Sequence, residues 1–336
     1  VLAVLNKNGG LVKAVATLSK ESVDLEGGHI LHGAYANFFG PDPLQLLFVV
    51  ILTSLGTWGL PQMVGKFYSI KNESSIKKGT IISTFFAIVV AGGCYFLGGF
   101  GRLFANSGAI KWQDEAHTKP FFDSIIPAML SELPAVVISI VIVLVLAASM
   151  STLSSLVLTS SSTLTLDVIA PASKNMTEKK KVGIMRLFII FFVVISAVLA
   201  ILKDSLNLTF IAQMMGVSWG AMAGAFLAPF LYGLYSKKIT KASVGVCFVF
   251  ATAMTIMQLL VSFFNVISFD PDTVIGFIFK SSINSGVVSM VCGLILVPLV
   301  SLFTPKQDAK AVDAMFACYD QKVMTEVKMR ERLEEK

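Results

Sequence analysis

A run of hydroxyl side chains near the middle of the chain is the strongest chemical signal in the sequence. Eleven of the 21 residues from 147 to 167 are Ser or Thr. A helix over this run places one set of residues on a single face, because they follow the spacing i, i+3, i+4, i+7 and i+11. This set consists of Ala148, Ser151, Thr152, Ser155 and Thr159.

A row of neutral hydroxyl oxygens suits an alkali cation that has lost its water, because such a cation prefers several hard oxygen donors. The alternative is structural, since helical Ser and Thr often donate to the carbonyl four residues earlier or to a neighbouring helix. One or two hydroxyls would favour the structural interpretation. The density of this run favours an ion site or a hydrophilic path.

A second unusual stretch combines helix-breaking residues with polar side chains. Residues 53–62 read Thr-Ser-Leu-Gly-Thr-Trp-Gly-Leu-Pro-Gln, inside a segment without charge. Interrupted backbone survives at membrane depth only where it is buried or lines a cavity. One interpretation is a discontinuous helix that faces a solute, and the other is a proline kink packed on small residues. The candidate solute contacts are Thr53, Thr57, Trp58 and Gln62.

Gln213 is a further candidate for contact with a solute. It is an amide in an apolar stretch that also contains Gly216, Gly220 and Pro229. A hydrogen bond between helices explains such an amide equally well. The last two apolar stretches, from 242 onward, are expected to be ordinary hydrophobic helices, with Gln258 and Asn265 near one boundary.

These candidates lie in segments long enough to cross a bilayer. The 336-residue chain is 55% hydrophobic and only 14% charged, whereas a soluble domain averages about 25% charged residues. Six of its seven charge-free stretches exceed the ~20 residues that a membrane-spanning helix needs. The pattern predicts an all-α polytopic membrane protein and excludes a soluble enzyme, a nucleic-acid binder, a disordered protein and an outer-membrane barrel. The stretches are 43–65, 79–101, 133–166, 187–202, 205–236, 242–269 and 281–304.

The basic residues predict the orientation of these spans. The loops 66–78, 167–186 and 237–241 carry 12 Lys and Arg, whereas the three loops of the opposite side carry five. Cytoplasmic loops are enriched in Lys and Arg, so we expect the first set to be cytoplasmic. The residues after Thr304 then form a cytoplasmic tail, which we expect to contain a short solvated or surface-lying helix.

The ends of the chain suggest three regions. Val1–Leu5 is apolar and precedes a polar segment, like the last turn of another span, so we expect helices upstream of this chain. We expect residues 1–42 to hold that end and an external loop with at most one short helix. Residues 43–303 would be the transmembrane domain, part of a larger domain, and 304–336 the tail. The sequence shows no catalytic motif and no cluster of buried carboxylates, so an enzyme is not expected.

The hydroxyl-rich run resembles a segment of the sodium:solute symporter family. In that family a Met-Ser-Thr-Leu-Ser run, here Met150–Ser154, precedes a Ser-Ser pair and an acidic residue, here Asp167. Residues 59–67 are similar to a family segment that ends in a basic residue and Phe. Residues 218–240 are similar to the tenth core helix and the loop after it. The matches keep the family's order over roughly residues 43–303.

The resemblance implies a LeuT-type inverted-repeat transporter fold, of which this chain would supply the second repeat and two extra C-terminal helices. It implies a sodium-coupled symporter of the bacterial plasma membrane that imports a small organic solute, such as an amino acid or organic acid, by alternating access. The coupling ion would be Na⁺, and no nucleic acid would be a partner. By position, the sodium site would take the Ala148 carbonyl and the hydroxyls of Ser151 and Thr152, with Ser155 at a second sodium position.

The chain departs from the family in the broken segment. Thr57 and Leu60 stand where the family often has an aromatic residue and Gln, so Trp58 is expected to take the gating role, and the solute cannot be inherited. An alternative function is a transporter-like membrane sensor for a small ligand. The short tail carries no signalling motif, and this disfavours the sensor.

Overall fold

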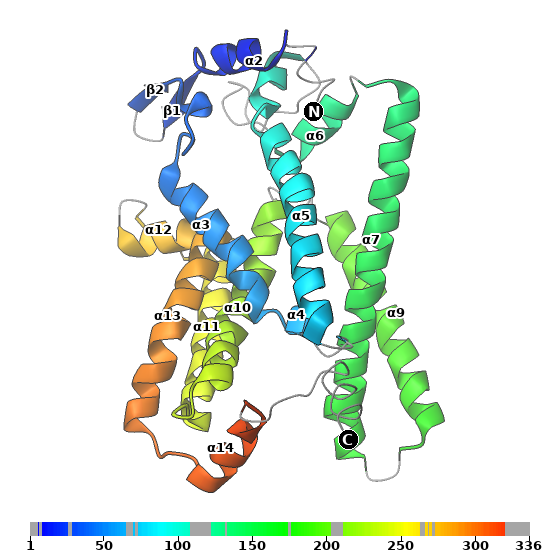
Figure 1. The fold of residues 1–336 in the computed structure, drawn as a ribbon, viewed down its shortest axis with the longest axis vertical. Helices are drawn as coiled ribbons and strands as arrows, with labels where there is room; N and C mark the ends of the chain where they lie inside the picture. The colour runs from blue at the N-terminus through cyan, green and yellow to red at the C-terminus, as the bar shows by residue number, and fades with distance from the viewer. Residues whose placement is uncertain are drawn as a thin grey trace, which may run out of the picture. The chain divides into compact units, whose positions relative to one another are not determined.

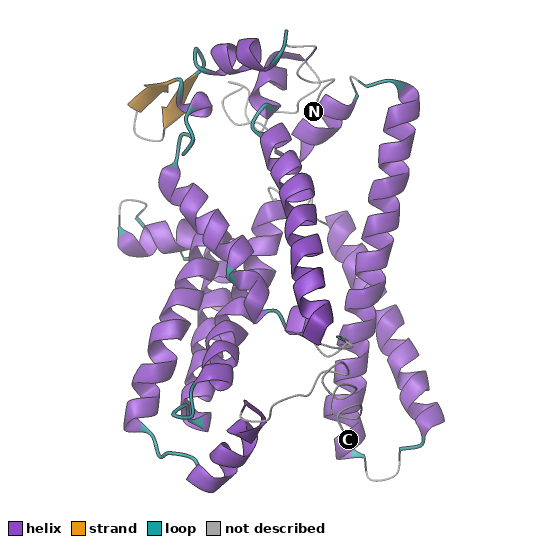
Figure 2. Ribbon diagram, viewed as in Figure 1, coloured by secondary structure: helices purple, strands orange, loops and turns teal. Residues whose placement is uncertain are grey.

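Helices dominate the structure, a computed structural model (Figure 2). Six of them are long and apolar enough to cross a membrane, and a shorter apolar helical segment covers Pro43–Gly59. The chain divides into two compact units. Unit 1 contains Asn8–Arg102 and Ile211–Lys336, and unit 2 contains Leu103–Phe210. The structure describes residues 6, 9–25, 29–64, 70, 73–107, 122–131, 133–173, 176–202, 211–262, 266–267, 269–270 and 273–319.

Unit 1 begins with a small helix and a hairpin. Helix α2 (Leu11–Leu18) precedes the antiparallel strands β1 (Ser22–Leu25) and β2 (His29–His32), and the short turn η1 (Ala34–Ala36) follows. The strands are the orange arrows of Figure 2. The short helix was expected for this region, whereas the hairpin was not, so the description as all-α needs this small exception.

The first predicted span of unit 1 is broken. Helix α3 (Pro43–Ser54) starts where the Asp42 carboxylate accepts a hydrogen bond from Gln45 N at 2.9 Å, with proline at the first helical position. A 3₁₀ turn, η2 (Gly56–Gly59), follows α3. After it, Leu60 is extended, and the short helix α4 (Pro61–Val64) begins. Proline cannot donate a backbone hydrogen bond, so it ends one helical segment and opens the next.

Helices α10, α11 and α13 form the packed core of unit 1, and α3 crosses α10 and α13 obliquely (Figure 1). The Tyr232 hydroxyl of α10 donates to the Leu294 carbonyl of α13 at 2.8 Å. A buried apolar cluster joins α3, α10 and α13 through Leu52, Ala223, Leu227, Ile283, Val287 and Met290. The bounds of the remaining helices are α5 (Glu73–Gly98), α10 (Ile211–Tyr235), α11 (Lys241–Ser262), α12 (Val274–Lys280) and α13 (Ser282–Phe303), with η4 at Gly101–Ser107.

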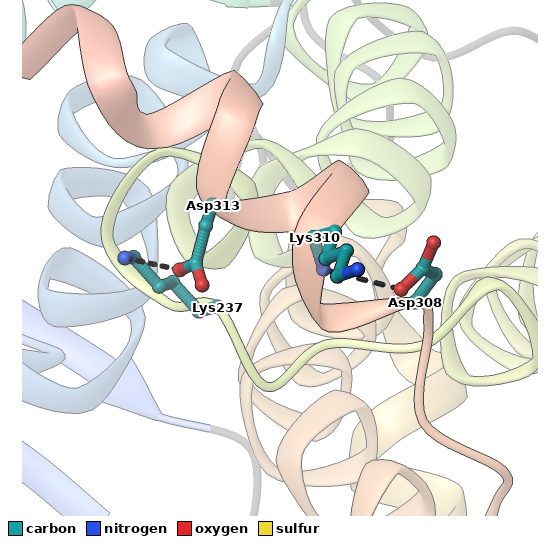
Figure 3. A network of polar contacts seen from close by, with 4 residues as sticks. All are labelled: Lys237, Asp308, Lys310 and Asp313. Atoms are coloured by element: carbon teal, nitrogen blue, oxygen red, sulfur yellow. Dashed lines mark hydrogen bonds and ion pairs between the residues drawn. The ribbon is translucent and has the colours of Figure 1, made fainter.

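The end of unit 1 confirms the predicted tail helix. Helix α14 (Ala309–Phe316) is capped by Asp308, whose carboxylate accepts from Lys310 N at 3.1 Å, and the turn η7 (Ala317–Tyr319) follows. Figure 3 shows this cap beside the ion pair between Lys237 Nζ and Asp313 Oδ1, at 2.7 Å. Lys237 also lies over the Phe316 ring. These contacts hold the tail helix on the loop between α10 and α11.

Unit 2 contains two long helices. Helix α7 (Ala135–Thr163) continues into a π-helical turn, η6 (Leu164–Ile169), and then into α8 (Ala170–Ala172). Helix α9 (Glu178–Leu202) packs against α7. The smaller elements of the unit are η5 (Phe122–Ser124) and α6 (Ile125–Leu130).

The observed helices follow the predicted spans closely. The last span, predicted over 281–304, is a helix over 282–303. The helix of the second span begins at Glu73, six residues before the predicted 79–101, because charged residues at a helix end can lie outside the apolar region. Residues 65–67 of the family-like segment and the start of the fifth span, 205–210, lie outside the described residues.

Candidate functional site

Several hydroxyls of α7 donate to a carbonyl of their own helix. Ser154 donates to the Met150 carbonyl at 2.7 Å, and Thr159 donates to the Ser155 carbonyl at 2.8 Å. Ser155 donates to the Thr152 carbonyl at 3.0 Å. Ser161 and Ser162 make the same kind of bond three residues back. For these residues the structural interpretation of the hydroxyl run accounts for the side chain.

Ser151 and Thr152 belong to the hydroxyl residues of α7 that make no such bond, as do Ser149, Ser160 and Thr163. The side chains of Ser151 and Thr152 are exposed, and their hydroxyls bond to no residue that the structure describes. Ala148, one turn earlier, is exposed as well. The exposed face therefore keeps two hydroxyl groups available for a ligand, and neutral hydroxyl oxygens are donors that fit Na⁺. Of the four predicted sodium residues, only Ser155 has its hydroxyl engaged in a backbone bond.

The hydroxyl run ends in a feature that the sequence did not predict. The turn η6 is π-helical, a rare geometry that appears mostly as single turns at functional sites. Within it, Thr165 is fully buried and its hydroxyl has no hydrogen-bond partner among the described residues. Nothing in the residue types of this turn distinguishes it from the α-helix before it, so sequence reasoning had no signal for it.

In unit 1, one side of the turn in the broken segment packs tightly against α10. A Cβ atom added to Gly59 would lie 2.9 Å from Leu227 N and 3.0 Å from Ala223 Cα of α10. Leu60 is fully buried. The turn therefore depends on a residue without a side chain at position 59, which explains why the helix can break here and still pack against α10.

The predicted solute contacts lie on the same broken segment. The hydroxyls of Thr53 and Thr57 donate to the backbone, at 2.8 Å to the carbonyls of Val49 and Ser54. Trp58 is 59% exposed, and Gln62 is half-buried. Trp58 is thus the large side chain that this segment presents outward. Gln213 lies in the first turn of α10, and its side chain is not among the parts of the chain that the structure describes.

The two sets of candidates belong to different units. The sodium candidates lie on one helix of unit 2, and Thr53, Thr57, Trp58 and Gln62 lie on one segment of unit 1. Each set is brought together by local structure alone. Within the described parts of the chain, no group of three or more His, Cys, Asp or Glu side chains could hold a metal, so the donors on offer for an ion are neutral oxygens.

The last two spans are hydrophobic helices as predicted, but they also bury polar side chains that the prediction missed. Helix α13 buries a set of polar side chains, and Gln258 of α11 is buried beside them at 2% exposure. The spacing of serines along this span was the available signal, because residues three or four apart share a helix face. The buried polar side chains at the start of α13 are Ser282, Asn284, Ser285 and Ser289.

The helices of this chain have the features of one class of protein. Six long apolar helices, a broken shorter one and polar groups at membrane depth are features of a polytopic membrane transporter. The model of the sodium:solute symporter family matches residues 1–245, and the chain belongs to this family. Helices α11, beyond its first residues, and α13 lie outside the matched region.

Three bacterial relatives show the same relationship. The monocarboxylic acid transporter of Corynebacterium glutamicum is 26% identical over 262 residues, 71% of this chain and 44% of the relative. The osmoregulated proline transporter of Bacillus subtilis is 24% identical over 188 residues, 56% and 36%. The sodium/proline symporter of Staphylococcus aureus is 26% identical over 254 residues, 72% and 44%. The matched parts of this chain span less than half the length of each relative.

The names of the family and of the relatives describe transport. The family is named for sodium:solute symport, and the three relatives are named as transporters or symporters, not as enzymes. Together with the apolar helices of this chain, the family and the relatives identify a multi-pass protein of the bacterial plasma membrane.

Proposed function

We propose that this chain supplies the second half of a LeuT-type sodium-coupled symporter that imports a small organic acid or amino acid. The proposal is supported by the family and by relatives named for monocarboxylic acids and proline. The observation that carries it is the exposed face of α7 that holds Ala148, Ser151 and Thr152, where neither hydroxyl bonds to a residue that the structure describes.

The sodium site would combine three groups of α7. The hydroxyls of Ser151 and Thr152 and the carbonyl of Ala148 would each donate an oxygen. The hydroxyl of Ser155 already donates to the Thr152 carbonyl, but its oxygen still has lone pairs that can accept or coordinate. The Ser155 oxygen would therefore still be able to coordinate a second ion. The remaining oxygens would come from helices that precede this chain.

The solute site would lie at the broken segment. An interrupted helix leaves backbone groups without intrahelical partners, and these can bind polar groups of a solute. Trp58 would cover the bound solute as an aromatic gate, while Thr53, Thr57, Gln62 and Gln213 would supply polar contacts. A monocarboxylate or an amino acid shares one carboxylate, which such neutral donors can hydrogen-bond.

Sodium can supply enough free energy for accumulation. One Na⁺ that moves inward through 100 mV contributes ~2.3 kcal/mol, and each tenfold concentration gradient adds about 1.4 kcal/mol. Together these amounts support accumulation of a solute by a few hundredfold.

The direct test is uptake by the full-length protein in proteoliposomes, with radiolabelled proline and acetate as alternative solutes. We expect uptake of one solute that requires an inward sodium gradient and stops when choline replaces sodium. Ser151→Ala is expected to raise the sodium concentration for half-maximal uptake, and Ser154→Ala is the matched control, since its hydroxyl is already bonded to Met150. Uptake that is equally fast in choline would contradict the sodium coupling.

A further inference from the structure

A small polar cavity lies where α10, α11 and α13 of unit 1 meet. Its volume is about 10 Å³. Helix α10 contributes Gly216 and Gly220, and α11 contributes Thr255 and Gln258. Helix α13 contributes hydroxyl groups and a glycine, namely Ser282, Ser285, Gly286 and Ser289. The cavity is not part of the predicted ion or solute sites.

The cavity exists because two backbones approach closely beside it. A Cβ atom added to Gly220 would lie 2.6 Å from Gly286 Cα, and one added to Gly286 would lie 2.8 Å from Gly220 Cα. Small residues allow membrane helices to come this near. The same absence of side chains leaves a space at the edge of the crossing that no apolar group fills.

Ser289 has a hydroxyl that the protein leaves without a partner. The residue is 2% exposed, and its Oγ atom bonds to no described residue. Two neighbours on the cavity have partners of their own. Thr255 donates to the Ala251 carbonyl at 2.9 Å. The Gln258 amide can bond to Ser262, Phe279 and Ser282 together. A buried hydroxyl without a partner costs ~1–3 kcal/mol, so a ligand that bonds to Ser289 would be stabilising.

We propose that one water molecule binds in this cavity and hydrogen-bonds to Ser289 Oγ. The volume corresponds to the ~10–15 Å³ that a single water needs. The lining offers hydroxyls that both donate and accept, and such partners suit a water molecule. This inference does not depend on the transported solute.

The test compares the thermal unfolding of the full-length protein with that of Ser289→Ala. If water bonds to the hydroxyl, its removal breaks that bond, and the Tm should fall by about 2–4 °C. If the hydroxyl has no partner, its removal relieves an unfavourable burial, and the Tm should stay the same or rise. The matched control is Ser218→Ala on α10, because the exposed Ser218 hydroxyl donates to its own helix at Met215.

Two further measurements separate the outcomes. The same unfolding experiments in sodium chloride and choline chloride distinguish water from a cation. A Ser289→Ala effect that disappears without sodium would overturn the proposal in favour of a sodium ion. If Ser289→Ala does not fold, a high-resolution density map of the unmodified protein decides. A peak within hydrogen-bond distance of Ser289 Oγ supports the water, and its absence in a map that resolves other buried waters rejects it.

Discussion

The hydroxyl-bearing helices of the two units treat polar side chains in opposite ways. In unit 1, α13 buries its serines against α10 and α11, and 39% of the residues in its most apolar stretch are buried within the chain. In unit 2, no residue in the most apolar stretch of α7 is buried, and Ser151 and Thr152 are exposed. Serine and threonine therefore serve two purposes in this chain. Enclosed serines belong to helix packing, while the exposed face of α7 keeps oxygens available for a ligand or another helix.

The largest effect is expected on the exposed face of α7. The double variant Ser151→Ala with Thr152→Ala should nearly abolish sodium-coupled uptake, and each single change should raise the half-maximal sodium concentration about tenfold or more. A hydroxyl bonded to a charged partner contributes ~1.5–3 kcal/mol, and a methyl group cannot replace it. Sodium titration of uptake measures this. A double variant that titrates like the unmodified protein would show that this face of α7 does not bind sodium.

A large effect on folding is expected on the enclosed side, at Gly59. A Cβ there approaches backbone atoms of α10 within 3 Å, so Gly59→Ala should destabilise the protein by about 1–3 kcal/mol. Gly92→Ala on α5 is the control, because nothing lies within 4 Å of its added Cβ. It should be neutral or stabilising, since alanine favours a helix. Thermal unfolding in detergent checks both, and equal Tm values would contradict the packing argument.

A moderate effect on solute affinity is expected at Trp58, the neighbour of Gly59 that faces outward. Trp58→Ala should raise the KM for the solute severalfold while the Tm changes little, because the side chain is 59% exposed. Tyr95→Ala on α5 is the control, with a side chain that is 69% exposed. Uptake kinetics measure both. If the two variants raise KM equally, Trp58 has no gating role.

The smallest effect is expected at the ion pair of the tail. Lys237 and Asp313 have exposed side chains, and exposed pairs contribute ~0–1 kcal/mol. Asp313→Asn should therefore leave the Tm almost unchanged and only accelerate cleavage of the tail by chymotrypsin, whose aromatic target residues are the same in all variants. The double reversal, Lys237→Asp with Asp313→Lys, should restore the slow cleavage. Faster cleavage in the double reversal than in Asp313→Asn would show that the ion pair does not hold α14.

Sequence predicted the features that depend on local composition. Long charge-free stretches gave the spans, and Gly56, Gly59 and Pro61 gave the break after α3, because glycine and proline act wherever the rest of the chain lies. The tail helix followed in the same way. These predictions needed no knowledge of which helices become neighbours.

The remaining features depend on contacts between distant residues. The hairpin β1–β2 depends on pairing that its sequence did not signal. Whether a serine bonds to its own helix depends on its rotamer and surroundings, so Ser151 and Ser154 look equivalent in sequence. Ser289 became informative only when α10 was found beside it. The serine spacing on α13 was visible, but it does not reveal which helix covers that face.

The π turn at Leu164–Ile169 has a consequence for insertions and deletions. A π turn holds one residue more than the α turn that it replaces. Deleting one residue inside this turn would therefore restore a regular α-helix and keep the segments on both sides oriented as they are now. The same deletion near Leu156 would rotate everything beyond it by about 100° and turn Ser161 and Thr165 out of their buried positions. This helix should thus tolerate a change of length only at the π turn.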